Sequence, residues 1–475
     1  MFEGQLHLWS IIYAVYCVIA MVMMVNVLLK NRDSVKTLAW IMVFIFLPFI
    51  GIFLYFFFGR DKRKEKLVGN RLLSQIKQRE QLADGTNQQH DTNDAYLPLQ
   101  NYFCNSSSSP LLPAASIEVI PAPAMFMKLL LEELDKAEDH IHMEFYIFEN
   151  DSIGGQLRDK LIEKARQGVE VRLIYDSVGC WKVDKSFYEA MRCAGVYVES
   201  FLKVRFPLFT NKVNYRNHRK VVVIDGKTGF VGGCNVADRY VNGVEWGVWR
   251  DTMIMIRGKA VRGLQSSFLI DWYFSNRSLV SGRRYYPLSD VGASAQVQVV
   301  QSNPVGEVRT IMGGMVKLLS LSRNYIYMHT PYFMPDESFM LALKSAAMSG
   351  VDVRLMVPER VDSVIAGYAS ASYFSELLKS GVKIYLYSAG FLHSKCVVCD
   401  DYVSSVGSAN LDFRSFYHNF EVSAFVYDRA VAQRLKECFM DDIKQCRQLV
   451  EGEFRQRPLK RRVMESLARL FSPLL

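Results

Sequence analysis

Lysine and arginine are absent from the first eight residues of this 475-residue chain. A cleaved signal peptide has a basic segment before its apolar core, so we expect the N-terminal segment to be retained. The nine cysteines are odd in number and lack a regular spacing. This pattern argues against a disulfide framework and suits a reducing compartment.

Apolar residues, in contrast, make up half of the sequence. Leu8 to Leu29 and Thr37 to Gly59 are runs long enough to cross a hydrocarbon core of roughly 30 Å as helices. Basic residues are more numerous after the second run, at residues 60–79, than between the two runs. This asymmetry predicts a multi-pass membrane protein with a cytoplasmic C-terminal body. The net charge of +9 would either attract that body to an anionic leaflet or form a solvated basic surface.

Composition divides the chain into segments. Helical and strand-like patterns alternate in the larger part, which indicates an α/β fold, and the order of helix, glycine and strand occurs twice. The C-terminal segment is expected either to dock on the body or to lie on a membrane surface. The predicted segments are a membrane hairpin with a basic flank (1–66), a linker (67–116), a first repeat (117–290), a second repeat (291–450) and a basic amphipathic segment (451–475).

Histidine is scarce, with eight residues, yet two histidines occur in the same motif. The pattern His-x-Lys-x4-Asp occurs twice, and a turn of small residues and an asparagine follow each copy at the same distance. The residues are His218, Lys220, Asp225 and Asn235 in the first copy and His393, Lys395, Asp400 and Asn410 in the second. A duplicated set of this kind predicts one phosphate site built from two halves.

Carboxylates and thiolates are missing from the groups that the motif would bring to a pocket. On a strand, side chains alternate, so the histidine and the lysine of each copy project from one face. The two lysines and the amides of Asn235 and Asn410 can stabilise charge on a phosphate diester, and the set does not suit a metal. One histidine can attack phosphorus while the other exchanges a proton with the alcohol. We therefore expect no metal and no cofactor.

The six His, Lys and Asp residues of the motif are assigned to the catalytic set, but the aspartates have a different expected position. Asp225 is followed by Gly226 and Lys227, which is a hairpin-turn signal, and Asp400 occupies the matching place. Each aspartate should lie away from the pocket, where it fixes the turn or the surroundings of a lysine.

With these motifs the chain resembles the phospholipase D superfamily, and within it the bacterial cardiolipin synthases. Segments outside the motif support the narrower resemblance: Thr330 to Phe333, Val406 to Asp412, Asn419 to Glu421 and Phe471 to Leu475. The resemblance implies a pseudo-two-fold repeat of two α/β/α sandwiches, preceded by two transmembrane helices. It also implies an enzyme of a bacterial inner (plasma) membrane that makes cardiolipin and glycerol from two phosphatidylglycerol molecules through a phosphatidyl-histidine.

The same resemblance assigns roles to individual residues. His218 would be the nucleophile, and His393 would be the acid and base. Glu421 and Asp251 are similar in placement to acidic residues that orient the opposite histidine, Glu421 for His218 and Asp251 for His393. As the alternative, either one could be a surface carboxylate.

Three other functions stay open at this point. A phospholipase D would hand the same intermediate to water, and a basic nuclease would use the same site on nucleic acid. The predicted spans disfavour a nuclease, and a non-catalytic membrane scaffold would not need two complete motifs. The expected partners are phosphatidylglycerol, cardiolipin and an anionic membrane, without nucleic acid, and an oligomer is compatible with the sequence. Phosphatidylethanolamine also stays open as the donor.

Overall fold

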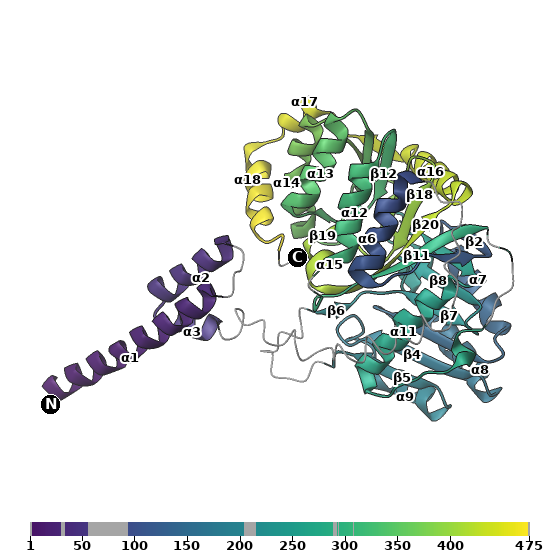
Figure 1. The fold of residues 1–475 in the computed structure, drawn as a ribbon, viewed down its shortest axis with the longest axis horizontal. Coiled ribbons are helices and arrows are strands. Elements are labelled where there is room, and N and C mark those ends of the chain that lie inside the picture. Colours follow the sequence, from purple (N-terminus) through teal and green to yellow (C-terminus); the bar gives the residue numbers. More distant parts are fainter. Residues whose placement is uncertain are drawn as a thin grey trace. The chain divides into compact units, whose positions relative to one another are not determined.

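The chain forms two units, a helical N-terminal unit and a larger α/β body (Figure 1). The N-terminal unit contains the described residues up to 55, and the body contains those from 94 onward. The computed structural model describes residues 2–29, 34–55, 94–203, 215–287, 292, 294–306 and 308–473.

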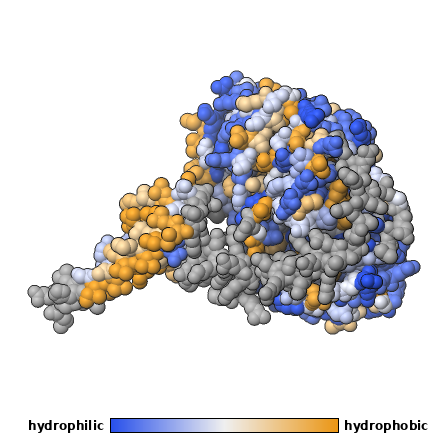
Figure 2. All heavy atoms as spheres, viewed as in Figure 1, coloured by the Kyte–Doolittle hydropathy of each residue, from blue (hydrophilic) through white to orange (hydrophobic). Residues whose placement is uncertain are grey.

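The described part of the N-terminal unit contains the apolar helices α1 (Phe2–Leu28), α2 (Ser34–Phe46) and α3 (Ile50–Leu54). Within α1, Trp9–Leu28 is a 20-residue segment that is long and apolar enough to cross a membrane. It is the one such helix among the described residues. Figure 2 shows hydrophobic atoms along the surface of this unit, as expected for a helix that contacts hydrocarbon.

The second predicted span, Thr37 to Gly59, is not one continuous helix. α2 ends at Phe46, and α3 begins at Ile50 after a turn that contains Pro48. Proline lacks a backbone N–H, and its ring clashes with the preceding helical turn, so it interrupts the helix. The expectation of two transmembrane helices is corrected to one long apolar helix followed by an interrupted apolar segment. The basic flank at residues 60–79 lies outside the described residues.

The first half of the body is a seven-stranded sheet with the order β2-β10-β8-β7-β3-β4-β5. β3, β4 and β5 are parallel, whereas β3, β7, β8, β10 and β2 pair antiparallel. The bounds are β2 (Ser116–Ile120), α7 (Pro123–Asp135), β3 (His140–Phe145), α8 (Ser152–Arg166), β4 (Glu170–Asp176), α9 (Lys185–Cys193), β5 (Tyr197–Phe201), β6 (Arg216–Asn217), β7 (Val221–Ile224), β8 (Thr228–Gly232), α10 (Asp238–Asn242), β9 (Val248–Arg250), β10 (Met253–Arg257), α11 (Val261–Asn276) and η4 (Arg283–Tyr285).

The second half is a ten-stranded sheet with the path β1-β11-β20-β18-β17-β12-β14-β15-β21, and β6 pairs with β20 beside this path. The bounds are η2 (Asp94–Tyr96), α6 (Leu97–Ser107), β1 (Leu112–Ala114), β11 (Ala295–Ser302), α12 (Thr310–Leu321), β12 (Tyr325–His329), β13 (Phe333–Met334), α13 (Glu337–Met348), β14 (Asp352–Pro358), α14 (Val364–Lys379), β15 (Lys383–Tyr387), β16 (Gly390–Leu392), β17 (Cys396–Cys399), β18 (Val403–Gly407), β19 (Leu411–Asp412), α15 (Phe413–Tyr417), β20 (Asn419–Tyr427), α16 (Arg429–Ile443), β21 (Cys446–Gln448), α17 (Glu451–Arg455) and α18 (Leu459–Leu470).

The two sheets repeat one topology. The order β10-β8-β7-β3-β4-β5 in the first sheet matches β20-β18-β17-β12-β14-β15 in the second. Gly168 and Gly350 end equivalent helices before β4 and β14, with φ angles of 93° and 92°. Glycine reaches this left-handed conformation without the penalty that a Cβ atom brings, which explains the glycine that recurs between helix and strand. The predicted α/β architecture with two similar halves is confirmed.

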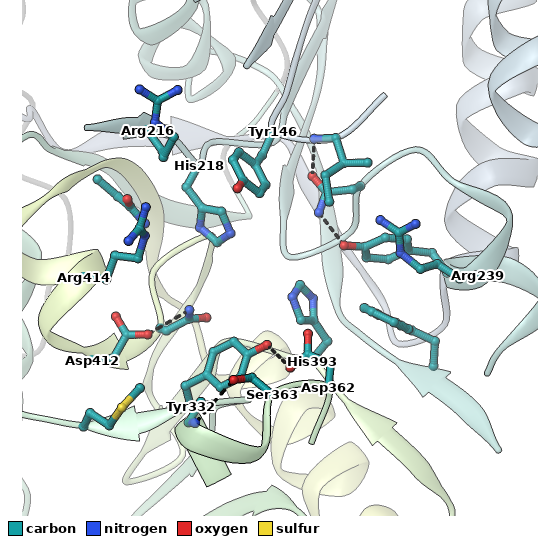
Figure 3. Close-up of a pocket in the computed structure, with 18 residues that line it drawn as sticks. Tyr146, Arg216, His218, Arg239, Tyr332, Asp362, Ser363, His393, Asp412 and Arg414 are labelled. Atoms are coloured by element: carbon teal, nitrogen blue, oxygen red, sulfur yellow. Dashed lines mark hydrogen bonds between the residues drawn. The ribbon is translucent and has the colours of Figure 1, made fainter. Parts of the chain in front are cut away.

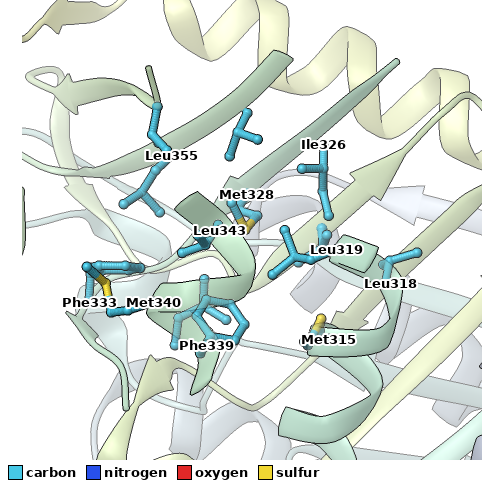
Figure 4. Close-up of a cluster of buried hydrophobic side chains, with 14 of the residues drawn as sticks. Met315, Leu318, Leu319, Ile326, Met328, Phe333, Phe339, Met340, Leu343 and Leu355 are labelled. Atoms are coloured by element: carbon cyan, nitrogen blue, oxygen red, sulfur yellow. The ribbon is translucent and has the colours of Figure 1, made fainter. Parts of the chain in front are cut away.

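Buried side chains join the helices to the sheets and the two halves to each other. On one face of the second sheet, Phe339 and Leu343 of α13 pack among residues of α12, β12 and β14 (Figure 4). Another core contains Val223 of β7 together with Val406 of β18 and Val422 of β20. Because this core includes strands of both halves, it fixes them relative to each other, as a site shared between them requires.

The expected linker, residues 67–116, is structured from residue 94 onward. Leu99 and Phe103 of α6 are completely buried, and the ring centroids of Phe103 and Phe425 in β20 are 4.4 Å apart. Their four-residue spacing is a helical period. The sequence nevertheless favours a linker, because the neighbouring residues are polar and rich in serine. The earlier part of this linker, residues 67–93, lies outside the described residues.

The C-terminal helix α18 docks on α14 through a face that the apolar pattern did not predict. Arg469 forms an ion pair of 2.9 Å with Glu376 of α14, and the buried Glu465 accepts from Arg457 at 2.7 Å. Docking on the body is therefore observed, and contact with a membrane surface stays a prediction. The apolar stripe remains exposed at Leu459, Val463, Leu467 and Leu470.

Candidate active site

Short strands that cross between the halves hold the two motif histidines. β6 precedes His218 and pairs with β20 of the second half, whereas β16 precedes His393 and pairs with β9 of the first half. The backbone N–H of His218 donates to the carbonyl of Phe420 at 3.0 Å, and that of His393 donates to the carbonyl of Arg250 at 2.7 Å. Each histidine is thus fixed by the half to which it does not belong.

The motif residues lie between strands, which corrects the placement on a strand. His218–Lys220 connects β6 to β7, and His393–Lys395 connects β16 to β17. The lysine side chains turn back along the chain: Lys220 Nζ donates to the carbonyl of His218 at 2.6 Å, and Lys395 Nζ donates to that of His393. Both lysines are buried and neither lines the cavity, so they lie behind the histidines.

A cavity of about 350 Å³ brings four of the predicted site residues together, His218, His393, Asn235 and Asn410. Figure 3 shows the two imidazoles on opposite sides of this space. Among the described residues, no group of three or more His, Cys, Asp or Glu side chains could hold a metal ion. The described lining groups are two imidazoles with amide, guanidinium, aromatic and carboxylate neighbours.

A buried carboxylate from the opposite half binds each histidine. His218 Nδ1 lies 3.0 Å from Glu421 Oε1, and His393 Nδ1 lies 2.6 Å from Asp251 Oδ2. Both carboxylates have no exposed surface, so neither is the surface residue of the alternative interpretation. With Nδ1 donating to a carboxylate, Nε2 of each ring is the nitrogen left for a ligand.

The two asparagines line the cavity, but protein groups already bind their amides. Asn235 Oδ1 accepts from the backbone N–H of Ile147 at 3.0 Å, and its Nδ2 donates to the hydroxyl of Tyr240 at 2.5 Å. Asn410 Nδ2 donates to Asp412 at 3.1 Å, and its buried Oδ1 has no partner among the described residues. Their contact with a phosphate stays a prediction.

Asp225 and Asp400 lie away from the cavity and are corrected from catalytic to structural residues. Asp225 accepts the three successive backbone N–H groups of residues 138–140, at 2.9, 2.8 and 2.8 Å. Asp400 binds residues 323–325 in the same way, at 2.7, 2.8 and 2.8 Å. Each carboxylate fixes the segment that enters an interior strand of its sheet, β3 or β12, and hydrogen bonds of this kind stabilise the fold.

Several residues of the cavity were not selected from the sequence. Arg216 lies two positions before His218, and the alternation of a strand would have placed both on one side. The others come from separate elements such as α10, β9 and α15, so no spacing marks them. The cavity-lining residues of this group are Tyr146, Arg216, Arg239, Trp249, Tyr332, Asp362, Asp412 and Arg414.

Comparison with known proteins identifies the family. The model "Cardiolipin synthase, PLD-like domain" matches residues 130–272 and 315–443, one match in each half. A cardiolipin synthase of Geobacillus sp. (strain WCH70) is 41% identical over 94% of this chain and 90% of its own length. The chain belongs to the cardiolipin synthase family. The major cardiolipin synthase ClsA of Bacillus subtilis (strain 168) is 37% identical and covers 98% of this chain and 99% of its own length.

Two further matches concern parts of the molecule. A model described as phospholipase D-nuclease N-terminal matches residues 12–60, the region of the apolar helices. The crystal structure of phosphatidylserine synthase from Haemophilus influenzae Rd KW20 has a TM-score of 0.63 and covers 80% of this chain and 100% of its own. Its sequence identity of 16% shows a shared fold alone.

Burial and nearby cations favour neutral imidazoles at the site of this cardiolipin synthase family member. Burial lowers the pKa of His218 to about 4, although the charge of Glu421 opposes this shift. Burial also lowers the pKa of His393 well below its usual value, and the charges of Lys395 and Lys220 act in the same direction. Both rings are therefore neutral at pH 7 before an anionic substrate binds.

The two carboxylates differ in their tendency to ionise. Burial raises the pKa of Asp251 to about 6, against the opposing charge of Lys395. Burial also disfavours the charged form of Glu421, but His218, Lys220 and the Ser408 hydroxyl outweigh it and lower the pKa of Glu421. Glu421 is thus the more firmly ionised partner. The two histidines therefore have different electrostatic surroundings despite the repeated motif.

The lysines titrate close to neutral pH. Burial lowers the pKa of Lys220 to about 7 and that of Lys395 to about 8. A bound phosphate diester would favour their protonated forms, because an adjacent negative charge stabilises an ammonium group. The site can therefore gain positive charge when an anionic substrate arrives.

Proposed function

We propose that this chain is a membrane-bound phosphatidyltransferase that makes cardiolipin and glycerol from two phosphatidylglycerol molecules through a covalent phosphatidyl-histidine. The arrangement of the two histidines gives the main support, because each faces one cavity and donates from Nδ1 to a buried carboxylate of the opposite half. A transfer through a covalent intermediate needs two such groups, a nucleophile and a separate acid and base. The product is the one that the names of the close relatives state.

In the first step, His218 Nε2 attacks the phosphorus of one phosphatidylglycerol. A phosphorus–nitrogen bond forms, and the phosphorus–oxygen bond to glycerol breaks. The ionised Glu421 stabilises the positive charge that develops on the imidazole ring of His218. His393 donates the proton that the departing glycerol oxygen requires. The negative charge of the bound diester raises the low pKa of His393, so that His393 takes up this proton from solvent before the attack.

In the second step, the primary hydroxyl of another phosphatidylglycerol takes the place of the departed glycerol. His393, now neutral, accepts the hydroxyl proton while the hydroxyl oxygen attacks phosphorus. The phosphorus–nitrogen bond to His218 breaks, and cardiolipin is released. His218 is neutral again and His393 carries the proton for the next cycle, while Lys220 and Lys395 stabilise negative charge on the transferring phosphoryl group from behind the histidines.

We further propose a multi-pass enzyme of a bacterial plasma membrane with its α/β body in the cytoplasm. The apolar helix α1 and the excess of basic residues at 60–79 support this topology, and the interrupted segment α2–α3 would complete a second pass. Protease added to inside-out vesicles should cleave a tag placed at the C-terminus, whereas protease added to intact spheroplasts should leave it whole. Cleavage in spheroplasts alone would place the body outside.

The transferase is tested by its products. Purified full-length protein, reconstituted with phosphatidylglycerol labelled in both glycerol and phosphate, should release one glycerol for each cardiolipin formed. Phosphatidic acid as the main product would instead identify the runner-up function, a phospholipase D that transfers the intermediate to water. Adding labelled phosphatidylethanolamine to the same vesicles shows which lipid is the donor, because use of phosphatidylethanolamine would release ethanolamine.

A further inference from the structure

The proposed transfer brings two phosphate diesters into one cavity. The residues of the paired motif can bind and neutralise only the one that is transferred. In the proposed mechanism, the transferring phosphate lies against His218, and both lysines lie behind the histidines. The acceptor lipid carries its own phosphate, which only a three-carbon glycerol separates from the attacking hydroxyl. This second negative charge must therefore lie near the first, and burying it without a cation would be unfavourable.

Among the described residues, three arginines line the cavity, and their ion-pair partners distinguish them. Arg216 forms an ion pair of 3.2 Å with Asp176, and Arg239 places one guanidinium nitrogen 2.9 Å from each carboxylate oxygen of Glu149. Arg414, on the short helix α15, is half-buried and forms no ion pair with any described residue. Its charge is the one among the three that no carboxylate in the described part of the chain neutralises.

Two carboxylates in the described part of the chain line the cavity, and both accept hydrogen bonds from neutral donors. Asp412 accepts from the backbone N–H of Ser415 at 2.7 Å and from Asn410 Nδ2 at 3.1 Å. Asp362 accepts from the hydroxyl of Tyr332 at 2.5 Å. Neither one is a counter-ion of Arg414. In Figure 3, Arg216 and Arg414 are on the left of His218, whereas His393 and Arg239 are on its right. Arg414, which has no ion-pair partner among the described residues, therefore lies on the His218 side of the cavity.

We propose that Arg414 binds the phosphate of the acceptor lipid and thereby selects a phosphate-bearing alcohol over water or free glycerol. The inference rests on the proposed transfer. A guanidinium group presents two parallel N–H donors, which match two oxygens of a phosphate diester. Arg414 takes part in no bond-making step: the hydroxyl oxygen still attacks phosphorus, its proton still goes to His393, and the bond to His218 still breaks.

The test compares two acceptors for the same intermediate. Labelled free glycerol, which has no phosphate, can return to the phosphatidyl-enzyme and give labelled phosphatidylglycerol, whereas cardiolipin requires the phosphate-bearing acceptor. In full-length protein reconstituted with phosphatidylglycerol, Arg414→Gln should lower cardiolipin formation on the order of 10- to 100-fold. Glycerol exchange should change less than about twofold. Arg434→Gln, on the exposed face of α16 where it pairs with Glu437 at 3.0 Å, is the matched control and should change neither rate.

Two results would overturn the inference while leaving the transferase intact. An equal loss of both reactions in Arg414→Gln would mean that Arg414 serves the transferring phosphate or the fold. Unchanged cardiolipin formation would mean that the acceptor phosphate binds elsewhere. A wild-type enzyme that yields phosphatidic acid in place of cardiolipin would instead refute the proposed function, and this inference with it.

Discussion

Replacing His218 by alanine is expected to lower turnover by on the order of 10⁴-fold or more and to abolish the covalent phospholipid adduct. His218 is the proposed nucleophile because its Nδ1 is bound by Glu421, the more firmly ionised of the two carboxylates, which can stabilise a positive charge on the ring. Burial brings the pKa of His218 to about 4. At neutral pH, Nε2 therefore carries a free lone pair. The measurement is rapid denaturation of the reconstituted enzyme during turnover of phosphate-labelled phosphatidylglycerol, followed by analysis for an acid-labile label on the protein.

His393→Ala should behave in the opposite way when the substrate needs no acid. A phosphatidyl ester of p-nitrophenol has a leaving group that departs without a donated proton, so His218 can still form the intermediate. Without His393 as the base, transfer to an alcohol is slow, and the labelled adduct should accumulate together with a burst of p-nitrophenol. If the label were retained in His218→Ala and missing from His393→Ala, His393 would be the nucleophile and His218 the acid and base.

The duplicated motif could be found in the sequence because its spacing is local and repeated. The carboxylate partners of its histidines have no such local spacing. Glu421 is 203 residues from His218, and Asp251 is 142 residues from His393. No periodicity links such distant positions, so they could be assigned only through the resemblance to a family. The structure gives the physical cause: β20 carries Glu421 to the strand that precedes His218, and β9 brings Asp251 to the strand that precedes His393.

Two expectations relied on the composition of a segment and missed a local feature within it. The apolar run that contains Pro48 has the composition of a span, but the proline ends the helix. The polar stretch before Ser116 has the composition of a linker, yet the spacing of Leu99 and Phe103 suffices for a docked helix. Asp225 was rightly expected near a turn, but its backbone partners at residues 138–140 are distant in sequence and could not be predicted.

The arginines of the cavity show where sequence reasoning stops. The chain has 57 lysines and arginines in total, and nothing in their spacing separates a surface charge from one that faces a substrate. Arg216, Arg239 and Arg414 arrive from β6, α10 and α15, and only the fold places them in one cavity. Arg216 and Arg239 pair with Asp176 and Glu149, whereas Arg414 has no ion pair with a described carboxylate. The proposed selectivity between acceptors would thus depend on tertiary structure, whereas the motif alone predicts the phosphoryl chemistry.

Replacing Asp251 by asparagine should lower kcat/KM by on the order of 10³- to 10⁴-fold while preserving the fold. The carboxylate accepts the Nδ1–H of His393 at 2.6 Å and so keeps Nε2 available to exchange protons with glycerol. An amide can present its NH₂ group to Nδ1, which favours the other tautomer and places the ring hydrogen on Nε2. The acid–base function of His393 would then be lost without any loss of packing.

The pH dependence of kcat/KM gives this prediction a second readout. In the wild-type enzyme, Asp251 takes up a proton as the pH falls through its pKa of about 6, so activity should fall on the acid side. Lys220 and Lys395 lose their charge as the pH rises through about 7 and 8, so activity should also fall on the alkaline side. Asp251→Asn should lack the acid limb near pH 6 and keep the alkaline limb.

Asp225→Asn is the matched control, because it makes the same carboxylate-to-amide change in a residue that does not line the cavity. It weakens three hydrogen bonds to backbone N–H groups, so it should lower the melting temperature and cost about 1.5–3 kcal/mol of stability. Both limbs of its pH profile should remain, since the histidines keep their partners. If Asp251→Asn retained the acid limb, or if Asp225→Asn lost it, Asp251 would not be the group that controls proton transfer through His393.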